Sequence, residues 1–167
     1  SSAASDVYKR QGIFLPVLDK DETIDIQVSI DMSGSISNEM ARDFMSEIHG
    51  IMGSYNDYKI GILCFDTQVY NYQEFTQENA DDLLRYEPKG GGGTDFMAFW
   101  NYYIDNQIEP KKVICFTDGF PCGTWGPENF ADTLWIITEG AKTRVKPPFG
   151  VYAYFEPKVG VEELDAA

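Results

Sequence analysis

The chain has 167 residues and a formal net charge of −14, from 27 acidic and 13 basic side chains. This length predicts a single domain with one substantial core. The negative charge disfavours nucleic acid as a partner, because a phosphate backbone would be repelled, and no apolar run approaches the roughly 18 residues that cross a membrane.

Six short segments have the composition or the alternation of β-strands. Apolar and polar residues alternate from Ile24 to Ile30, which is the period of a strand. The second and third segments are close enough to form a hairpin with an edge strand, with Asp66 and Thr67 in its turn. The last three are rich in β-branched and aromatic residues, which favours buried strands. The six segments are 23–30, 59–65, 67–75, 111–116, 133–138 and 150–155.

Helical spacing occurs between several of these strands. After the first strand, Met40, Phe44 and Ile48 recur every four residues, with Ser37 as a candidate N-cap. A second helix is expected to begin near Thr76. A third follows the glycine run 90–93, where aromatic residues recur at helical spacing. Strands that alternate with helices predict an α/β domain with a mostly parallel sheet.

Oxygen-bearing side chains follow two of these strands and precede the third helix. Asp31, Ser33 and Ser35 come directly after the first strand, Asp118 follows the strand at 111–116, and Thr94 follows the glycine run. Open α/β sheets bind ligands beyond the carboxyl ends of their strands. We therefore expect these five side chains to meet at one edge of the sheet.

The chemistry of this set is that of a site for a hard cation. Carboxylate and hydroxyl oxygens suit Mg²⁺, Mn²⁺ or Ca²⁺. Asp31 and Asp118 would balance a divalent charge, and hydroxyl groups would add ligands without adding charge. Gly34 is expected to let the backbone turn tightly between Ser33 and Ser35. A sixth, octahedral position would remain for water or for an incoming carboxylate.

Three motifs carry a resemblance to a known family. DMSGS, GGTD and TDG, in this order, resemble the three parts of the metal-ion-dependent adhesion site of von Willebrand factor A (VWA) domains. The resemblance implies a doubly wound, mostly parallel six-stranded sheet with helices on both faces and one antiparallel edge strand. It also implies that Ser33 and Ser35 bind the metal directly. Thr94, Asp31 and Asp118 would bind it directly or through water.

Four further residues are expected to surround this site. Gly34 and Gly93 belong to its turns. Asp95, which departs from many adhesive members of the family, is expected to support the site or to cap the following helix. Asp66 is expected to serve mainly the hairpin turn.

A longer resemblance extends over roughly residues 10–157. GIFLPVL, LWIITEG and KPPFGVYAYFE resemble the VWA-like C-terminal domain of predicted metal-dependent peptidases of bacteria and phages. In that group the HExxH motif lies in a separate N-terminal domain, and this chain has no HExxH, so the domain is not expected to be an enzyme. We expect a linker or expression-derived segment at 1–10, the VWA-like domain at 11–160 and a tail at 161–167.

These features predict a binding module in which a divalent cation binds a carboxylate of a protein partner. The expected partner is a neighbouring peptidase-like domain or an AAA+ ATPase, and neither nucleic acid nor a membrane. Two alternatives stay open. A Mg²⁺-dependent phosphotransferase of haloacid-dehalogenase type would use Asp31, but Ser33 stands where those enzymes have a second Asp. A structural VWA domain would bind no metal.

Three cysteines, Cys64, Cys115 and Cys122, form an odd set whose spacing fits neither a zinc site nor a redox pair. Cys64 and Cys115 fall within apolar runs, where a free thiol behaves as a small hydrophobic group. This pattern predicts a reducing, cytoplasmic location.

Overall fold

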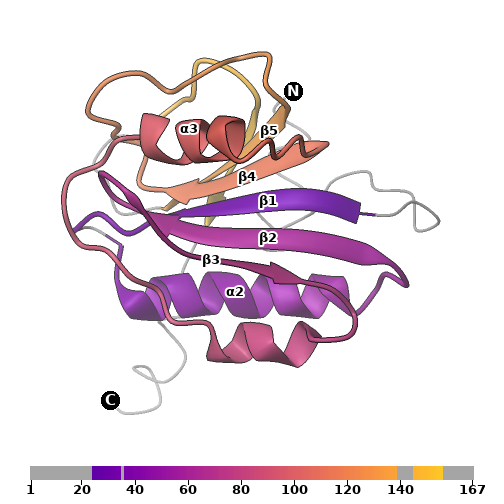
Figure 1. The fold of residues 1–167 in the computed structure, drawn as a ribbon. Helices are drawn as coiled ribbons and strands as arrows, with labels where there is room; N and C mark the ends of the chain where they lie inside the picture. The colour runs from indigo at the N-terminus through magenta and orange to yellow at the C-terminus, as the bar shows by residue number, and fades with distance from the viewer. Residues whose placement is uncertain (1–23, 35, 139–144, 156–167) are drawn as a thin grey trace, which may run out of the picture.

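Six strands form one sheet in the computed structural model, which describes residues 24–34, 36–138 and 145–155. The sheet order is β3-β2-β1-β4-β5-β6, with β3 antiparallel to β2 and every other neighbouring pair parallel (Figure 1). This confirms the predicted α/β fold with a mostly parallel sheet and one antiparallel edge strand. The strands are β1 (Ile24–Asp31), β2 (Tyr58–Phe65), β3 (Val69–Phe75), β4 (Lys112–Thr117), β5 (Asp132–Thr138) and β6 (Val151–Phe155).

The strand order reverses at the centre of the sheet. From β1 the chain proceeds outward to β2 and β3, and it then returns to the other side of β1 to form β4, β5 and β6. The point of reversal therefore lies between β1 and β4, and ligands of open α/β sheets bind there, beyond the carboxyl ends of the strands. Asp31 ends β1 and Thr117 ends β4, so both lie at this point.

Helices cover both faces of the sheet. Helix α2 (Asn38–Met52) and the short 3₁₀ helix η1 (Ala80–Arg85) lie on one face, and α3 (Met97–Asp105) lies on the other (Figure 1). The Ser37 hydroxyl accepts a hydrogen bond from the Met40 N–H at 3.1 Å, which confirms the predicted N-cap. Within the described ranges, no helix has the length and hydrophobicity to cross a membrane.

The second predicted helix is a shorter element than expected. The backbone N–H of Thr76 donates to Asn79 Oδ1 at 2.8 Å, and Asn79 Nδ2 donates to the Glu74 carbonyl at 3.1 Å. These bonds hold the start of the segment in a turn, so the helix begins only at Ala80. Six residues later Tyr86 is extended, which leaves room for a 3₁₀ helix and not for a longer α-helix.

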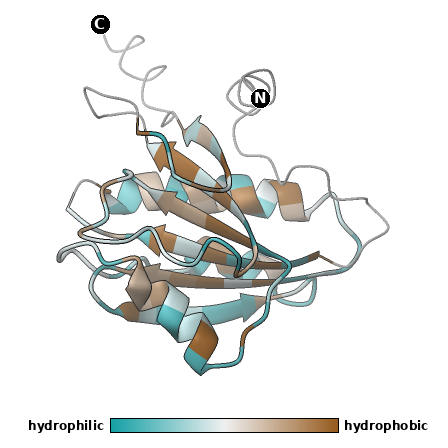
Figure 2. Cartoon of the chain, turned by 90° about the horizontal axis from the view of Figure 1, so that it is seen from above, coloured by the Kyte–Doolittle hydropathy of each residue, from teal (hydrophilic) through white to brown (hydrophobic). Residues whose placement is uncertain are grey.

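Two apolar layers pack against the sheet. On the α2 side, alternate residues of β1 from Ile24 to Ile30 are buried against the helix. On the α3 side, an aromatic cluster fills the space between the helix and β4 and β5; it comprises Phe65, Phe96, Phe99, Trp100, Tyr103, Trp125 and Trp135. Figure 2 shows hydrophobic residues concentrated on the central strands, whereas β3 is largely hydrophilic.

The α3-facing side of β1 is polar although it is buried. Gln27, Ser29 and Asp31 alternate with the isoleucines and valine, and all three are buried. Ser29 Oγ and the Tyr103 hydroxyl lie 2.7 Å apart and form a hydrogen bond across to α3. The alternation thus directs the Asp31 side chain toward the α3 face, where Thr117 of β4 also lies in phase with Val113.

Candidate metal site at the carboxyl edge of the sheet

A fully buried carboxylate lies at the centre of the candidate site. Asp31 Oδ1 accepts a hydrogen bond from the Ser33 N–H at 2.9 Å, and Oδ2 accepts one from Thr117 Oγ1 at 2.6 Å. The Thr117 hydroxyl in turn accepts from the Gly119 N–H at 3.0 Å. The carboxylate is therefore oriented by its own turn and by the neighbouring strand, and each oxygen keeps a further lone pair for a ligand.

The electrostatics of Asp31 favour a nearby cation. Burial raises the pKa of Asp31 above its ordinary value of 3.8, the hydrogen bonds from Thr117 and Ser33 lower it in part, and the neighbouring Asp118 carboxylate raises it again. Within the described part of the chain, no Lys or Arg forms an ion pair with Asp31. A divalent cation would offset the cost of this buried negative charge.

The Ser33 hydroxyl is buried and makes no hydrogen bond of normal geometry, although it lies close enough to Asp31 to lower the pKa of that carboxyl. Its residue is 7% exposed, and among the described residues only Ser33 Oγ and Gln27 Oε1 are buried polar side-chain atoms without such a bond. Buried polar atoms in folded proteins are nearly always paired. A hard cation would supply a partner for this buried oxygen beside Asp31, so the residues present fit a metal.

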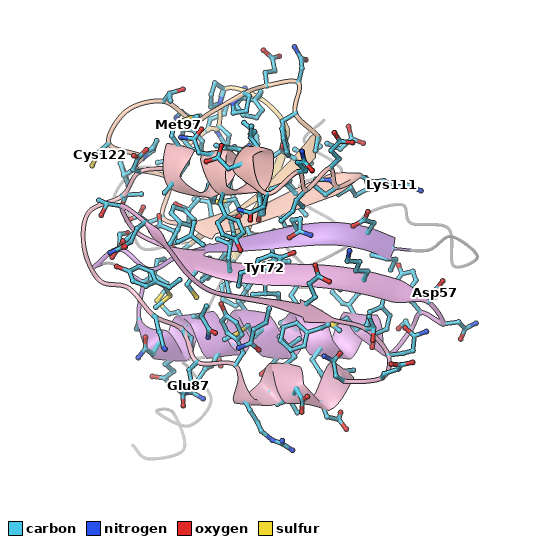
Figure 3. The ribbon with its side chains drawn as sticks, viewed as in Figure 1. Asp57, Tyr72, Glu87, Met97, Lys111 and Cys122 are labelled. Carbon is cyan, nitrogen blue, oxygen red and sulfur yellow. The ribbon has the colours of Figure 1, made fainter. Side chains whose placement is uncertain are left out.

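Asp118 and Thr94 belong to two further segments at the carboxyl edge of the sheet, the loop after β4 and the segment before α3. Asp118 is half-buried directly after β4, and its Oδ1 accepts a hydrogen bond from the Phe120 N–H at 3.2 Å. Thr94 is buried just before α3, and its carbonyl accepts from the Cys122 N–H at 2.9 Å. That bond ties the segment before α3 to the loop after β4. Figure 3 shows Cys122 near the start of α3, at the edge opposite Asp57 and Lys111.

The Asp66 carboxylate joins the turn between β2 and β3 to the glycine run 90–93 by hydrogen bonds. Its Oδ1 accepts from the backbone N–H groups of Thr67 and Gln68, and its Oδ2 accepts from the Gly92 N–H at 3.1 Å and from the Tyr70 hydroxyl at 3.3 Å. The predicted role in the hairpin turn is therefore present. The structure adds a second role, because the same carboxylate binds the glycine run that precedes Thr94.

The remaining predicted residues are placed as follows. Asp95 is exposed, and its Oδ1 accepts from the Met97 N–H at 2.9 Å, so it caps the first turn of α3. Gly93 is exposed, and a Cβ there would make only an ordinary contact. Ser35 lies outside the described residues.

The backbone turns tightly at Gly34, but its geometry does not require glycine there. The backbone of Gly34 is not in the left-handed region, and a Cβ added there would meet nothing within 4 Å. The turn after β1 is instead shaped by the hydrogen bond from Ser33 N–H to Asp31 and by one from Ile36 N–H to the Ser33 carbonyl at 2.9 Å. Glycine is therefore not required at this position by backbone geometry.

Two residues of the TDG motif, Thr117 and Gly119, support the site in roles that the sequence did not predict. Thr117 bonds directly to Asp31, and Gly119 has φ of +85° with Val145 atoms 3.0 Å from where its Cβ would lie. Glycine is favoured there on both counts. The available signal for Thr117 was its place as the last residue of the strand that carries Asp118.

The side chains available to bind a metal at this edge offer only oxygen atoms. Among the described residues, no group of three or more His, Cys, Asp or Glu side chains is placed to hold a metal. A metal at the carboxyl edge would therefore depend on two carboxylates, Asp31 and Asp118, together with hydroxyl groups. Such an all-oxygen set suits hard cations and not zinc or copper.

A parallel sheet of this order, flanked by helices and closed at one edge by an antiparallel strand, defines the class of VWA-like α/β domains. Residues 26–156 match the family model described as VWA-like domain (DUF2201), and the chain belongs to this family. A comparison with curated proteins gives no match.

Solved structures agree on the fold at low sequence identity. The chain is similar to the conserved hypothetical protein BatB from Bacteroides thetaiotaomicron, with TM-score 0.54, 12% identity, and coverage of 86% of this chain and 94% of that one. It is also similar to proximal thread matrix protein 1 from the mussel byssus, with TM-score 0.59, 14% identity, and coverage of 90% of this chain and 46% of that one. A third similar structure is the ArnB paralog VWA2 from Sulfolobus acidocaldarius, with TM-score 0.53, 14% identity, and coverage of 80% of this chain and 40% of that one. The chain thus spans less than half of the mussel and archaeal proteins.

Proposed function

We propose that this VWA-like domain is a divalent-metal-dependent interaction module that binds a carboxylate of a protein partner. The observation that carries the proposal is the buried Ser33 hydroxyl, which makes no hydrogen bond of normal geometry and lies beside the buried Asp31 carboxylate. Both groups are ligands that hard cations prefer. Within the described residues, the carboxylate has no ion pair with Lys or Arg, and the hydroxyl makes no hydrogen bond of normal geometry.

Each residue has a distinct role in the proposed module. Asp31, Ser33, Thr94 and Asp118, with Ser35, would hold Mg²⁺, Mn²⁺ or Ca²⁺. The bound cation would supply a Lewis-acidic position for an incoming carboxylate. Thr117 orients Asp31 through the 2.6 Å hydrogen bond. The hydrogen bond from the Cys122 N–H to the Thr94 carbonyl joins the loop after β4 to the segment before α3.

The proposed partner presents an acidic side chain, and we assign no catalytic role to this domain. A net charge of −14 repels an acidic partner at long range, so the cation would have to supply the attraction at short range. The longer resemblance to peptidase-associated domains supports a neighbouring peptidase-like domain or an AAA+ ATPase as the source of that side chain.

Thermal unfolding of chelator-treated protein tests the metal site. Metal at ten times its dissociation constant adds about 1.4 kcal/mol to the free energy of unfolding, which raises the midpoint of a domain of this size by about 3–6 °C. The Asp118→Ala variant should show no rise. Asp95→Ala removes a neighbouring exposed carboxylate that caps α3 and should retain the rise. An unchanged midpoint at several millimolar Mg²⁺, Mn²⁺ and Ca²⁺ would overturn the proposal.

The carboxylate step is tested with a small probe in the same assay. N-acetyl-aspartate amide at millimolar concentration should raise the midpoint further when Mn²⁺ is present and should have no effect in chelator. N-acetyl-asparagine amide is the matched control, since it differs only in the charge and ligand quality of its side chain. Equal responses to the two probes would contradict recognition of a carboxylate.

A further inference from the structure

The sheet face on the α2 side loses its cover toward β6. Val28, Ile114, Leu134 and Val151 are aligned in one row across β1, β4, β5 and β6 by the strand register. Their exposed fractions rise along that row from 0% and 1% to 7% and then 48%. Parallel strands are normally covered on both faces, so an element is expected over the β5 and β6 end of the row.

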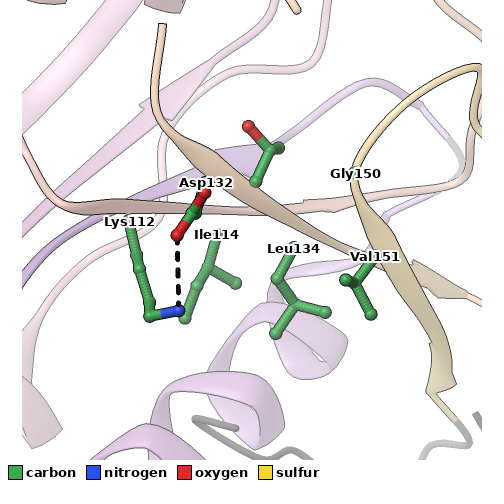
Figure 4. A pocket seen from close by; sticks show the side chains of 7 residues that line it. Lys112, Ile114, Asp132, Leu134, Gly150 and Val151 are labelled. Carbon is green, nitrogen blue, oxygen red and sulfur yellow. Dashed lines mark ion pairs between the residues drawn. The ribbon is translucent and has the colours of Figure 1, made fainter. Parts of the chain in front are cut away.

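A groove of about 310 Å³ lies over this end of the row. Figure 4 shows Ile114, Leu134 and Val151 side by side along it, with the ion pair between Lys112 Nζ and Asp132 Oδ2 next to them at 3.9 Å. We refer to it as the amino-edge groove, because Lys112, Asp132 and Val151 are the first residues of their strands. Its lining residues are Lys112, Ile114, Asp132, Thr133, Leu134, Gly150 and Val151.

The chain enters the sheet at the same edge. Ile24 begins β1, and Ile26 is paired with Lys112, so the residues before Ile24 leave the sheet two positions beyond a residue of the groove. The C-terminal segment departs in the other direction, because it follows Phe155 at the carboxyl end of β6. Of the two terminal segments, the N-terminal one therefore has the shorter route to the groove.

We propose that the apolar run Ile13–Leu18, which lies outside the described residues, occupies the amino-edge groove. Five of its six residues are Ile, Phe, Leu or Val, and the polar run DKDET separates it from Ile24. Two strand spacings and a four-residue offset place Leu134 about 16 Å from Ile24. The extended chain from Leu18 to Ile24 spans about 20 Å, which is long enough.

The charge pattern of the segment fits this placement. Ile13–Leu18 carries no charged side chain, so it can cover Leu134 and Val151 without burying an unpaired charge. The connecting residues DKDET are mostly charged and would remain in water, next to Lys112 and Asp132 at the same edge. Burial of the exposed half of Val151 would supply the driving force.

Cysteine cross-linking of the full chain tests the proposal. In a Cys122→Ser background, which removes the exposed thiol, the pair Leu15→Cys and Val151→Cys should react with a short bifunctional reagent within one molecule. The matched control pairs Leu15→Cys with Leu84→Cys, which is similarly exposed but lies on η1. We expect the first pair to cross-link at least about tenfold faster, as effective concentration favours neighbouring groups.

Three results would overturn the proposal. Equal rates for the two pairs would show that the segment has no preference for the groove. Faster reaction of Val151→Cys with a Leu164→Cys variant would assign the groove to the C-terminal segment. Cross-links formed mainly between two molecules would assign it to a second copy of the chain.

A stability measurement gives an independent readout. Val151→Asp should lower the unfolding midpoint by about 3–6 °C if the residue is covered, whereas Leu84→Asp should change it little. Leu15→Asp should produce a similar loss, and the double variant Leu15→Asp/Val151→Asp should lose less than the sum of the two. Additive losses, or no loss for Val151→Asp, would contradict the proposed contact.

Discussion

Two buried serines near the end of β1 differ in one respect. Ser29 is bonded to the Tyr103 hydroxyl at 2.7 Å, so it joins the strand to α3. The Ser33 hydroxyl makes no hydrogen bond of normal geometry, although its backbone N–H bonds to Asp31. A buried hydroxyl without a full hydrogen bond lowers stability and is uncommon in folded proteins. Ser29 thus has a structural role, and Ser33 is the residue available to a ligand.

Exchange of each serine for alanine should separate these two roles. In chelator, Ser33→Ala should change the free energy of unfolding little, because no hydrogen bond of normal geometry is lost, and it should abolish most of the rise with Mn²⁺. Ser29→Ala should lower the free energy of unfolding by about 1 kcal/mol and preserve the response to metal. Denaturant unfolding with and without Mn²⁺ measures both quantities. A large loss of stability for Ser33→Ala in chelator would contradict this assignment.

Local sequence predicts part of the site and not its internal support. Asp31, Ser33, Thr94 and Asp118 are predicted because each lies at or just after the end of a strand or just before a helix, and such ends meet at one edge of a parallel sheet. The bond from Thr117 depends on which strand lies beside β1 and in which register. That information is long-range, so the pattern around Thr117 alone does not contain it.

The β2–β3 hairpin is the element that links the fold to the site. Asp66 in its turn accepts hydrogen bonds from both neighbouring N–H groups and from Gly92 of the glycine run. Burial works to raise the pKa of Asp66, but the bonds from Gly92, Gln68, Thr67 and Tyr70 outweigh it, and the pKa is lowered below 3.8. The ionised carboxylate therefore stabilises the folded state.

The stability contributed by Asp66 should depend on pH in a defined direction. Because its pKa is lower in the folded than in the unfolded chain, its contribution is complete above about pH 4 to 5 and is lost as pH falls through the folded value. Asp66→Asn should lower the free energy of unfolding at pH 7 by about 1–3 kcal/mol, and the difference should shrink below about pH 3.5. Urea unfolding across pH 3–7 provides the measurement.

Asp105→Asn is the control for that experiment, because Asp105 is an exposed carboxylate at the end of α3. It should change stability little at any pH in this range. If Asp66→Asn lowered the free energy of unfolding by the same amount at pH 3 and pH 7, the loss would not come from the charge of the carboxylate.

The elements that sequence predicts well are those with long periodic patterns. The alternation in β1 and the four-residue spacing in α2 each predict one apolar face, and that face is the one buried in the core of the structure. The segment after β3 has no such pattern. Its side chains, such as that of Asn79, bond to nearby backbone groups, and this competition produces a turn and a 3₁₀ helix in place of an α-helix.

At the scale of the whole molecule, the net charge of −14 acts on any cation that binds. Charges across the surface attract Mn²⁺ at low ionic strength, since the screening length is about 30 Å in 10 mM salt and about 8 Å in 150 mM. We expect the Mn²⁺ dissociation constant to rise several-fold between these conditions in NaCl, as measured by calorimetry. A constant affinity would indicate that only the immediate ligands of the metal contribute.

The candidate metal site and the amino-edge groove lie at opposite ends of the parallel strands. Asp31 and Thr117 end β1 and β4, whereas Lys112 and Val151 begin β4 and β6. A partner bound at the carboxyl edge would therefore not compete with a segment in the groove. The two proposals are independent, and failure of one leaves the other standing.

The aromatic cluster beside α3 gives the protein an optical property. Its three tryptophans lie together: the ring centroids of Trp125 and Trp135 are 4.9 Å apart, those of Trp100 and Trp135 are 6.5 Å apart, and the Trp100 indole N–H donates to the Trp125 carbonyl. Trp125 belongs to the loop that begins at Asp118. The tryptophan fluorescence of the native chain is thus emitted from one place, next to the loop that a bound metal or partner would touch, and needs no added dye.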